Sequence, residues 1–138
     1  MPIFNDTEHF YSVLVPFFNK LKDDPNIGPK IMASGLVIRF CYTEPDAMIT
    51  IDCPNGNNVI AGPVEIEPTV TLTMKAIVAH RFWLGKVNLM VALTKREITA
   101  KGPLPALMKL LPLIKNAYGM YAEYLREIGM EDRIENWE

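Results

Sequence analysis

Side chains of the types and spacing that catalysis needs are scarce in this sequence. It contains two serines, Ser12 and Ser34, and neither lies in the Gly-x-Ser-x-Gly turn that presents a hydrolase nucleophile. The side chains that could bind zinc are few and scattered: His9, Cys41, Cys53 and His80. No glycine-rich phosphate loop of standard spacing is present. We therefore predict no catalytic residue, no metal site and no cofactor.

The titratable groups with the best case for contacting a ligand are His80, next to Arg81, and Arg39. His80 lies among apolar residues in a predicted helix. It could contact a lipid phosphate, or act as the base of an enzyme with a lipid-like substrate, but we favour a histidine on the helix surface. Arg39 lies between Ile38 and Phe40 in a predicted strand, and we expect its guanidinium to face solvent rather than a carboxylate.

Charge is distributed unevenly along the chain. The net charge of −2 over 138 residues argues against a dedicated nucleic-acid-binding protein. Residues 75–115 nonetheless hold eight basic side chains and one acidic, Glu97, and overlap the most apolar third of the sequence. This combination predicts either a transient contact with an anionic membrane or a solvated basic face.

The sequence also bears on the compartment. The most apolar stretch, 104–114, is interrupted by two prolines and a lysine and is shorter than the roughly 18 to 20 residues of a membrane-spanning helix. Two cysteines cannot form a disulfide framework, and the chain opens on no secretory signal. We therefore expect a cytoplasmic protein.

The first half of the chain shows helical and then strand periodicity. Apolar residues at helical spacing follow good N-cap residues and predict a helix over 7–22, which Pro16 should kink or divide in two. A short helical turn is expected at 30–33. Four segments have the composition or alternation of strands: residues 36–42, 48–53, 58–60 and 69–74. The last of these places three apolar residues on one face: Val70, Leu72 and Met74.

The second half ends in a long apolar segment. Before it, the pattern predicts two short helices and a strand: residues 76–84, 88–93 and 97–101. A last helix over 105–125 is apolar on more than one face, with bends allowed at Pro112 and Gly119. Since a surface helix needs one apolar stripe, the surplus must contact more protein, a dimer partner or a lipid. We interpret 1–138 as one domain that ends in a charged tail, 130–138.

Three local motifs follow one another in a recognisable order. They are Val70-Thr71-Leu72-Thr73-Met74, the pair Gly85-Lys86, and a strand followed by Gly102 and a leucine-rich helix. With the upstream hairpin, this order resembles the sterol carrier protein 2 (SCP-2) family over residues 5–120. The resemblance implies an α+β fold, in which helices cover a five-stranded, mostly antiparallel sheet. It also implies an apolar tunnel between sheet and helices that holds lipids or fatty acyl chains.

The resemblance and the surplus apolar surface together predict binding or transfer of an apolar ligand inside the cell, without chemistry. The expected ligands are a fatty acid, a fatty acyl-CoA, a phospholipid or a sterol-like lipid. The residues expected to line the tunnel are apolar or aromatic: Phe82, Leu89, Met90, Leu93, Leu107, Met108, Leu111, Ile114, Met120 and Tyr121. The residues expected to contact a headgroup are basic: Arg81, Lys86 and Lys115.

A second function class fits the same apolar surplus. The chain would then be a non-catalytic accessory or dimerisation module that docks on a lipid-metabolising enzyme. Its partner would be an enzyme or a second copy of the chain, and in neither class is it a nucleic acid.

Overall fold

The structure, a computed structural model, describes residues 3–135 and has an α+β fold. One sheet has the strand order β3-β2-β1-β4-β5. Its strands are β1 (Val37–Thr43), β2 (Ala47–Asp52), β3 (Asn58–Ala61), β4 (Val70–Lys75) and β5 (Ile98–Lys101). β1 and β4 run parallel, and the other three neighbouring pairs are antiparallel. The predicted five-stranded, mostly antiparallel sheet is confirmed.

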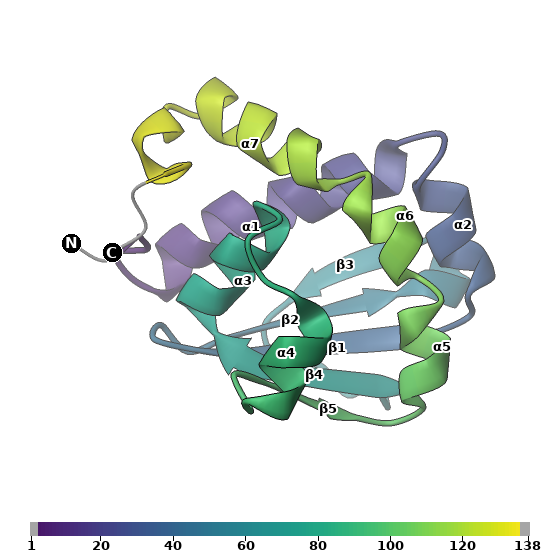
Figure 1. Cartoon of the computed structure of the whole chain (residues 1–138). Coiled ribbons are helices and arrows are strands. Elements are labelled where there is room, and N and C mark those ends of the chain that lie inside the picture. Colours follow the sequence, from purple (N-terminus) through teal and green to yellow (C-terminus); the bar gives the residue numbers. More distant parts are fainter. Residues whose placement is uncertain (1–2, 136–138) are drawn as a thin grey trace.

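Alternating apolar residues build the inner face of the sheet. The parallel register of the two central strands sets three pairs opposite one another: Ile38 and Val70, Phe40 and Leu72, Tyr42 and Met74. Successive side chains on a strand point to opposite faces, so these six share one face. Helices cover that face (Figure 1), and the predicted grouping of Val70, Leu72 and Met74 is confirmed.

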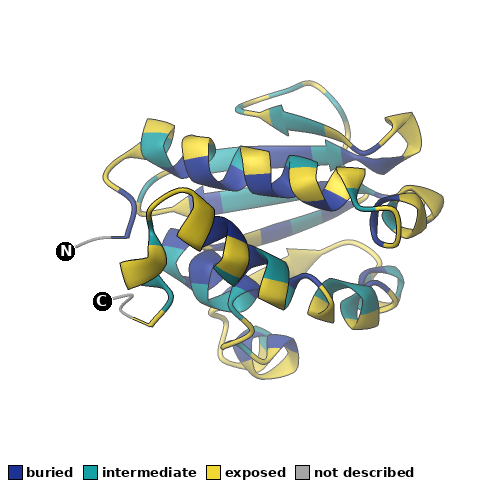
Figure 2. Ribbon diagram, turned by 90° about the horizontal axis from the view of Figure 1, so that it is seen from above, coloured by how far each residue is buried: buried dark blue, intermediate teal, exposed yellow. Residues whose placement is uncertain are grey.

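The helix that opens the chain, α1 (Thr7–Asp23), packs along the sheet. It begins where Oδ1 of Asp6 accepts a hydrogen bond of 2.8 Å from the backbone N–H of His9. Pro16 lies inside α1, yet the helix is continuous, so its predicted division in two is wrong. Figure 2 shows that α1 exposes one side and buries the other. Burial of that apolar side outweighs the backbone hydrogen bond that proline removes.

Short helices follow at the corners of the sheet. α2 (Gly28–Ala33) comes directly after α1, and the 3-10 turn η1 (Cys53–Asn55) joins the second and third strands. α3 (Ala76–Trp83) and α4 (Leu89–Thr94) confirm the two helices predicted between the fourth and fifth strands. Oδ1 of Asn88 accepts a 3.1 Å hydrogen bond from the backbone N–H of Val91, which caps α4.

The long C-terminal helix predicted over 105–125 is wrong, because the segment forms three helices. These are α5 (Leu104–Met108), α6 (Leu111–Lys115) and α7 (Tyr118–Glu127). Pro105 and Pro112 each occupy the first turn of a helix. Proline fits that position but clashes with the preceding turn when it lies deeper, so each one starts a new helix. In Figure 1 α5 and α6 rise at one end of the sheet and α7 returns along α1.

The C-terminal tail is ordered as far as it is described. A 3-10 turn, η2 (Glu131–Arg133), follows the last helix, and Ile134 packs against the core. Residues 136–138 of the predicted charged tail lie outside the described residues. Within residues 3–135, no helix is both long enough and apolar enough to cross a membrane.

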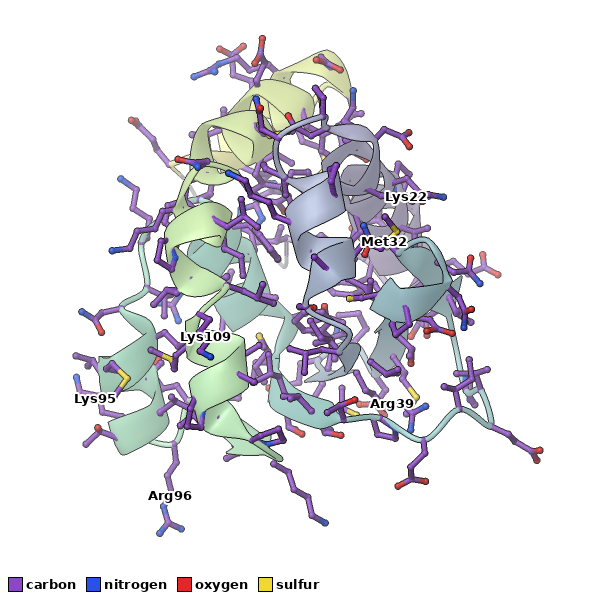
Figure 3. The ribbon with its side chains drawn as sticks, turned by 90° about the vertical axis from the view of Figure 1, so that its right-hand side faces the viewer. Lys22, Met32, Arg39, Lys95, Arg96 and Lys109 are labelled. Carbon is purple, nitrogen blue, oxygen red and sulfur yellow. The ribbon has the colours of Figure 1, made fainter. Side chains whose placement is uncertain are left out.

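The outer face of the sheet carries Arg39, whose guanidinium holds an irregular segment. Nε donates to Thr50 Oγ1 at 3.2 Å, and Nη2 donates to the carbonyls of Val64 at 3.2 Å and Ile66 at 2.7 Å. Arg39, labelled in Figure 3, is half-buried, and the partners of its guanidinium are a hydroxyl and two carbonyls rather than the carboxylate that was considered. Carbonyls in a segment without regular structure need donors, and the guanidinium supplies them.

Candidate ligand-binding site

An apolar cavity lies between the inner face of the sheet and α3, α4, α5 and α6. Its volume is about 50 Å³. Residues from all of these elements line it: Ile38, Phe40, Tyr42, Leu72, Met74, Ala79, Phe82, Trp83, Leu89, Ile98, Leu107, Leu111 and Ile114. The polar atoms of these side chains are the hydroxyl of Tyr42 and the indole N–H of Trp83, and all the other side chains are apolar, so this first cavity suits a hydrocarbon.

A second cavity of about 50 Å³ adjoins the first. Its lining comes from the end of α1, from α2, from the first three strands and from the α6 region: Phe18, Leu21, Lys22, Ile27, Ile31, Ile38, Phe40, Ile51, Asn57, Val59, Trp83, Leu110, Ile114 and Ala117. Four side chains line both cavities: Ile38, Phe40, Trp83 and Ile114. The two cavities therefore form neighbouring parts of one apolar interior, separated by side chains rather than by backbone layers.

Both cavities are small for a lipid. Small-molecule sites usually measure roughly 300–1,000 Å³, several times the volume of each cavity. Two of the helices that cover the cavities, α5 and α6, are short, with five residues each. Isolated helices of that length have little stability of their own, and in α6 no residue is fully buried. Outward movement of α6 would enlarge both cavities at once, because Ile114 lines both.

A surface hollow beside the first cavity brings together two of the predicted headgroup residues. Lys86 and Lys115 both line it, together with Leu89 and Leu111, which also line the first cavity. Gly85 fixes this turn: its φ is +79°, and a Cβ there would lie 2.9 Å from the Tyr118 ring. The hollow therefore adjoins the first cavity at Leu89 and Leu111.

The third predicted headgroup residue lies elsewhere. Arg81 lines a different hollow, at the ends of β4 and β5, and its Nη2 is 4.0 Å from Oε2 of Glu97. That hollow shares Met74 with the first cavity. The structure thus brings Lys86 and Lys115 together and sets Arg81 apart.

Half of the predicted lining residues border the first cavity: Phe82, Leu89, Leu107, Leu111 and Ile114. The other five border neither cavity. Met90 is 53% exposed, and Leu93, Met108 and Met120 are partly buried against the core. Tyr121 is fully buried, with its ring 4.8 Å from that of Phe17 on α1.

The strand residues that line the cavities were not among the lining residues predicted from the sequence. A usable signal existed, since the alternation of strands 36–42 and 69–74 places one side of each strand in the interior. The second cavity was missed entirely. Its lining combines segments from residue 18 to residue 117, and no local pattern joins them.

Tyr42 lines the first cavity and carries a buried polar atom. Its hydroxyl is buried and has no hydrogen-bond partner within residues 3–135. Burial raises the pKa of this hydroxyl well above its usual value, so it stays protonated at neutral pH.

His80 is not on the helix surface, so that expectation is wrong. The side chain is fully buried and both ring nitrogens bind protein atoms. Nε2 lies 2.8 Å from the carbonyl oxygen of Arg133, and Nδ1 lies 2.7 Å from the hydroxyl of Tyr121. Because a carbonyl only accepts, Nε2 carries the proton and Nδ1 accepts from Tyr121. Desolvation lowers the pKa of His80, although the hydrogen bond to Arg133 opposes this shift.

Side chains that could hold a metal are dispersed. Among residues 3–135, no three histidine, cysteine or acidic side chains come close enough to bind an ion together. Cys41 and Cys53 are free thiols, and burial raises the pKa of Cys53.

Comparison with known proteins identifies the family. The sequence profile of the SCP-2 sterol transfer family matches residues 18–115. The chain belongs to this family. No curated protein sequence matches it significantly.

Solved SCP-2 structures share the fold. The SCP-2 domain of Helicoverpa armigera has a TM-score of 0.65 at 19% identity, over 79% of this chain and 87% of that one. The UbiJ-SCP2 ubiquinone synthesis protein has a TM-score of 0.57 at 16% identity, over 80% and 89%. Aedes aegypti SCP-2 in complex with palmitate has a TM-score of 0.53 at 16% identity, over 76% and 90%.

Proposed function

We propose that this member of the SCP-2 family binds and transfers a lipid whose acyl chain occupies the interior between the sheet and α5–α6. The observation that carries the proposal is the pair of adjoining apolar cavities, which share four lining residues. The palmitate complex of the similar Aedes aegypti protein supports a fatty acid as the first ligand to test.

The acyl chain supplies the binding energy. Each methylene moved out of water contributes about 0.8 kcal/mol before the costs of ordering the ligand and of displacing α6. Because the interior is apolar, the chain needs no specific polar contact along its length. For a long saturated chain, the free energy gained by burial therefore exceeds these costs.

In this proposal the hollow lined by Lys86 and Lys115 is the mouth of the first cavity, and the headgroup lies there, between the two lysines. A carboxylate there pairs with two ammonium groups while it keeps contact with solvent. A phospholipid or fatty acyl-CoA would place its phosphate in the same hollow, whereas a sterol-like lipid would use the apolar interior alone. Arg81, which lines another hollow, is not included in this proposal.

The proposed function involves no chemistry. The one buried imidazole, His80, has both nitrogens engaged by the protein and borders neither cavity. We propose a cytoplasmic carrier that needs no cofactor.

Ligand capture tests this proposal. Protein purified without detergent should carry fatty acid or phospholipid in native mass spectra. After delipidation, palmitate should displace a fluorescent fatty acid with a dissociation constant in the micromolar range or below. Absence of bound lipid together with absence of displacement by palmitate, palmitoyl-CoA, phospholipid and sterol contradicts the proposal.

A second candidate function is an accessory module for an enzyme that acts on lipids. The observation that favours it is the similarity to the UbiJ-SCP2 ubiquinone synthesis protein. In this case the chain presents its ligand to an enzyme. Affinity capture from the native host should then retain a defined enzyme, and sedimentation velocity reports whether the chain alone forms the homodimer that the sequence suggested.

A further inference from the structure

Asn57 lies in the turn between η1 and β3 and lines the second cavity. Its φ is +56°, in the left-handed region that asparagine tolerates better than most residues with a side chain. The residue is 5% exposed, and its Nδ2 donates to the carbonyl oxygen of Gly28 at 2.7 Å. The turn and this hydrogen bond account for the backbone and for the amide nitrogen of Asn57.

The amide oxygen of Asn57 has no such explanation. Because the carbonyl of Gly28 only accepts, the amide atom that lies 2.7 Å from it is Nδ2, and the remaining atom is Oδ1. Oδ1 is buried and has no hydrogen-bond partner within residues 3–135. A buried acceptor without a donor is unfavourable, since it has lost its contact with water. A residue of the cavity lining therefore carries an unused acceptor.

The rest of the second cavity determines which ligand group suits this acceptor. The other lining side chains with a polar atom are Lys22 and Trp83, and both of them only donate. A neutral hydroxyl donates to Oδ1 of Asn57, whereas a carboxylate sets its own lone pairs against those of Oδ1. A methyl group leaves Oδ1 unpaired. The lining therefore favours a hydroxyl among the common end groups of a lipid.

The second cavity lies on the far side of the interior from the proposed mouth. Lys86 and Lys115 line the hollow that adjoins the first cavity, whereas Asn57 and Lys22 line the second cavity alone. Figure 3 shows Lys22 on the opposite side of the molecule from Lys95, the residue that follows α4. A chain whose headgroup lies between the two lysines thus directs its other end towards Asn57.

We infer that the preferred ligand carries a hydroxyl at the end of its chain remote from the headgroup, and that this hydroxyl donates to Oδ1 of Asn57. The inference rests on the proposed function and names the class of lipid, a hydroxylated long chain rather than a plain fatty acid. Such a pairing discriminates between ligands, because an analogue that lacks the hydroxyl leaves the buried acceptor unpaired.

A series of three ligands tests the inference on the parent protein. The probes are palmitate, 16-hydroxyhexadecanoate and 16-fluorohexadecanoate, each used to displace a fluorescent fatty acid from the delipidated protein. All three have the same carboxylate and chain length, but only the hydroxyl donates a hydrogen bond. We expect 16-hydroxyhexadecanoate to bind about five-fold more tightly than either of the others. In an interior without a free acceptor it would bind more weakly than palmitate, since an unpaired buried hydroxyl is costly.

Two matched variants locate the hydroxyl. Asn57→Gly removes Oδ1, and glycine tolerates the positive φ at this position. Asn55→Gly is the control, because Asn55 lines neither cavity and its Nδ2 also makes a 2.7 Å hydrogen bond, to Oδ2 of Asp52. Asn57→Gly should abolish the preference for 16-hydroxyhexadecanoate over 16-fluorohexadecanoate, and Asn55→Gly should keep it. A general loss of stability does not produce this result, since the readout is a ratio of two affinities.

The outcomes separate this inference from the proposed function. If the parent protein binds all three ligands equally well, the inference is overturned and the proposed function stands. If the preference survives in Asn57→Gly, the hydroxyl binds elsewhere and the inference is again overturned. Loss of the preference in Tyr42→Phe would then assign the hydroxyl to Tyr42, whose own hydroxyl is also buried and unpartnered within residues 3–135. If none of the three ligands binds, the proposed function and the inference both fail.

Discussion

The hydroxyl of Tyr121 lies 2.7 Å from Nδ1 of His80 in the interior between α7 and α3. The other ring nitrogen donates to the carbonyl of Arg133, so one imidazole links α3, α7 and the C-terminal turn. The ring of Phe4 packs edge-on against the same imidazole, with centroids 5.8 Å apart. His80 thus contacts Phe4 and Arg133, near the two limits of the described residues, and neither His80 nor Tyr121 lines either cavity.

Removal of the Tyr121 hydroxyl should destabilise the protein without weakening ligand binding. Tyr121→Phe leaves Nδ1 of buried His80 without a donor, which costs about 1–3 kcal/mol in the free energy of unfolding. Urea denaturation measures this loss. Tyr118→Phe is the control, since its hydroxyl makes no side-chain hydrogen bond within residues 3–135. An equal loss in both variants would show that the bond to His80 contributes nothing.

The stability of the protein should fall with acidity through His80. The pKa of His80 is lowered in the folded state. Below about pH 6.5, the ordinary pKa of histidine, the imidazole is therefore protonated in the unfolded chain but still neutral in the folded protein. The free energy of unfolding therefore declines as the pH drops from 6.5 towards the lower folded pKa. His80→Gln keeps a donor for Arg133 and should flatten this part of the profile. Parallel profiles for the two proteins would contradict the assignment.

Filling the boundary between the two cavities should block the ligand. Ile114→Phe adds volume where both cavities meet, and we expect the dissociation constant for palmitate to rise at least ten-fold, about 1.4 kcal/mol. Leu113→Phe is the neighbouring control, because Leu113 borders neither cavity. Fluorescent fatty-acid displacement measures both. Equal affinities of the two variants for palmitate would show that its acyl chain binds outside these two cavities.

The two lysines at the mouth should distinguish charged from neutral ligands. An exposed ion pair contributes about 0.2–1 kcal/mol, so Lys86→Glu combined with Lys115→Glu should weaken palmitate binding roughly two- to thirty-fold. Hexadecanol, which has no carboxylate, should bind this double variant nearly as well as the parent protein. Lys109→Glu, a charge reversal outside the hollow, serves as control. A matching loss for hexadecanol would mean that the variant is damaged rather than less basic.

The sheet could be predicted because its signals are local. The alternation of Val70, Leu72 and Met74 identifies β4 and its inner face from six consecutive residues. Gly85 likewise marks the end of α3 by its backbone preference, and Asn88 marks the start of α4 by its capping side chain. Lys86 and Lys115 were predicted from charge alone, and the fold brings them to one hollow.

The interactions that escaped prediction connect distant parts of the sequence. Arg39 binds carbonyls 25 and 27 residues away, in a segment without periodicity. His80 meets partners 41 and 53 residues away, so its own helical surroundings suggested a surface position. The prediction of one long C-terminal helix failed for another reason. Its apolar residues continue through 104–125, and Pro112, which begins a new helix, was interpreted as a bend within one long helix.

The most direct test of the proposed ligand position is the contact between a labelled ligand and the cavity methyl groups. With ¹³C-labelled palmitate bound to the delipidated protein, NMR should show intermolecular nuclear Overhauser effects from the acyl chain to the methyls of Ile38, Leu111 and Ile114. Contacts confined to exposed methyls such as Met32 or Ile128, with the interior methyls unperturbed at saturating palmitate, would contradict the account.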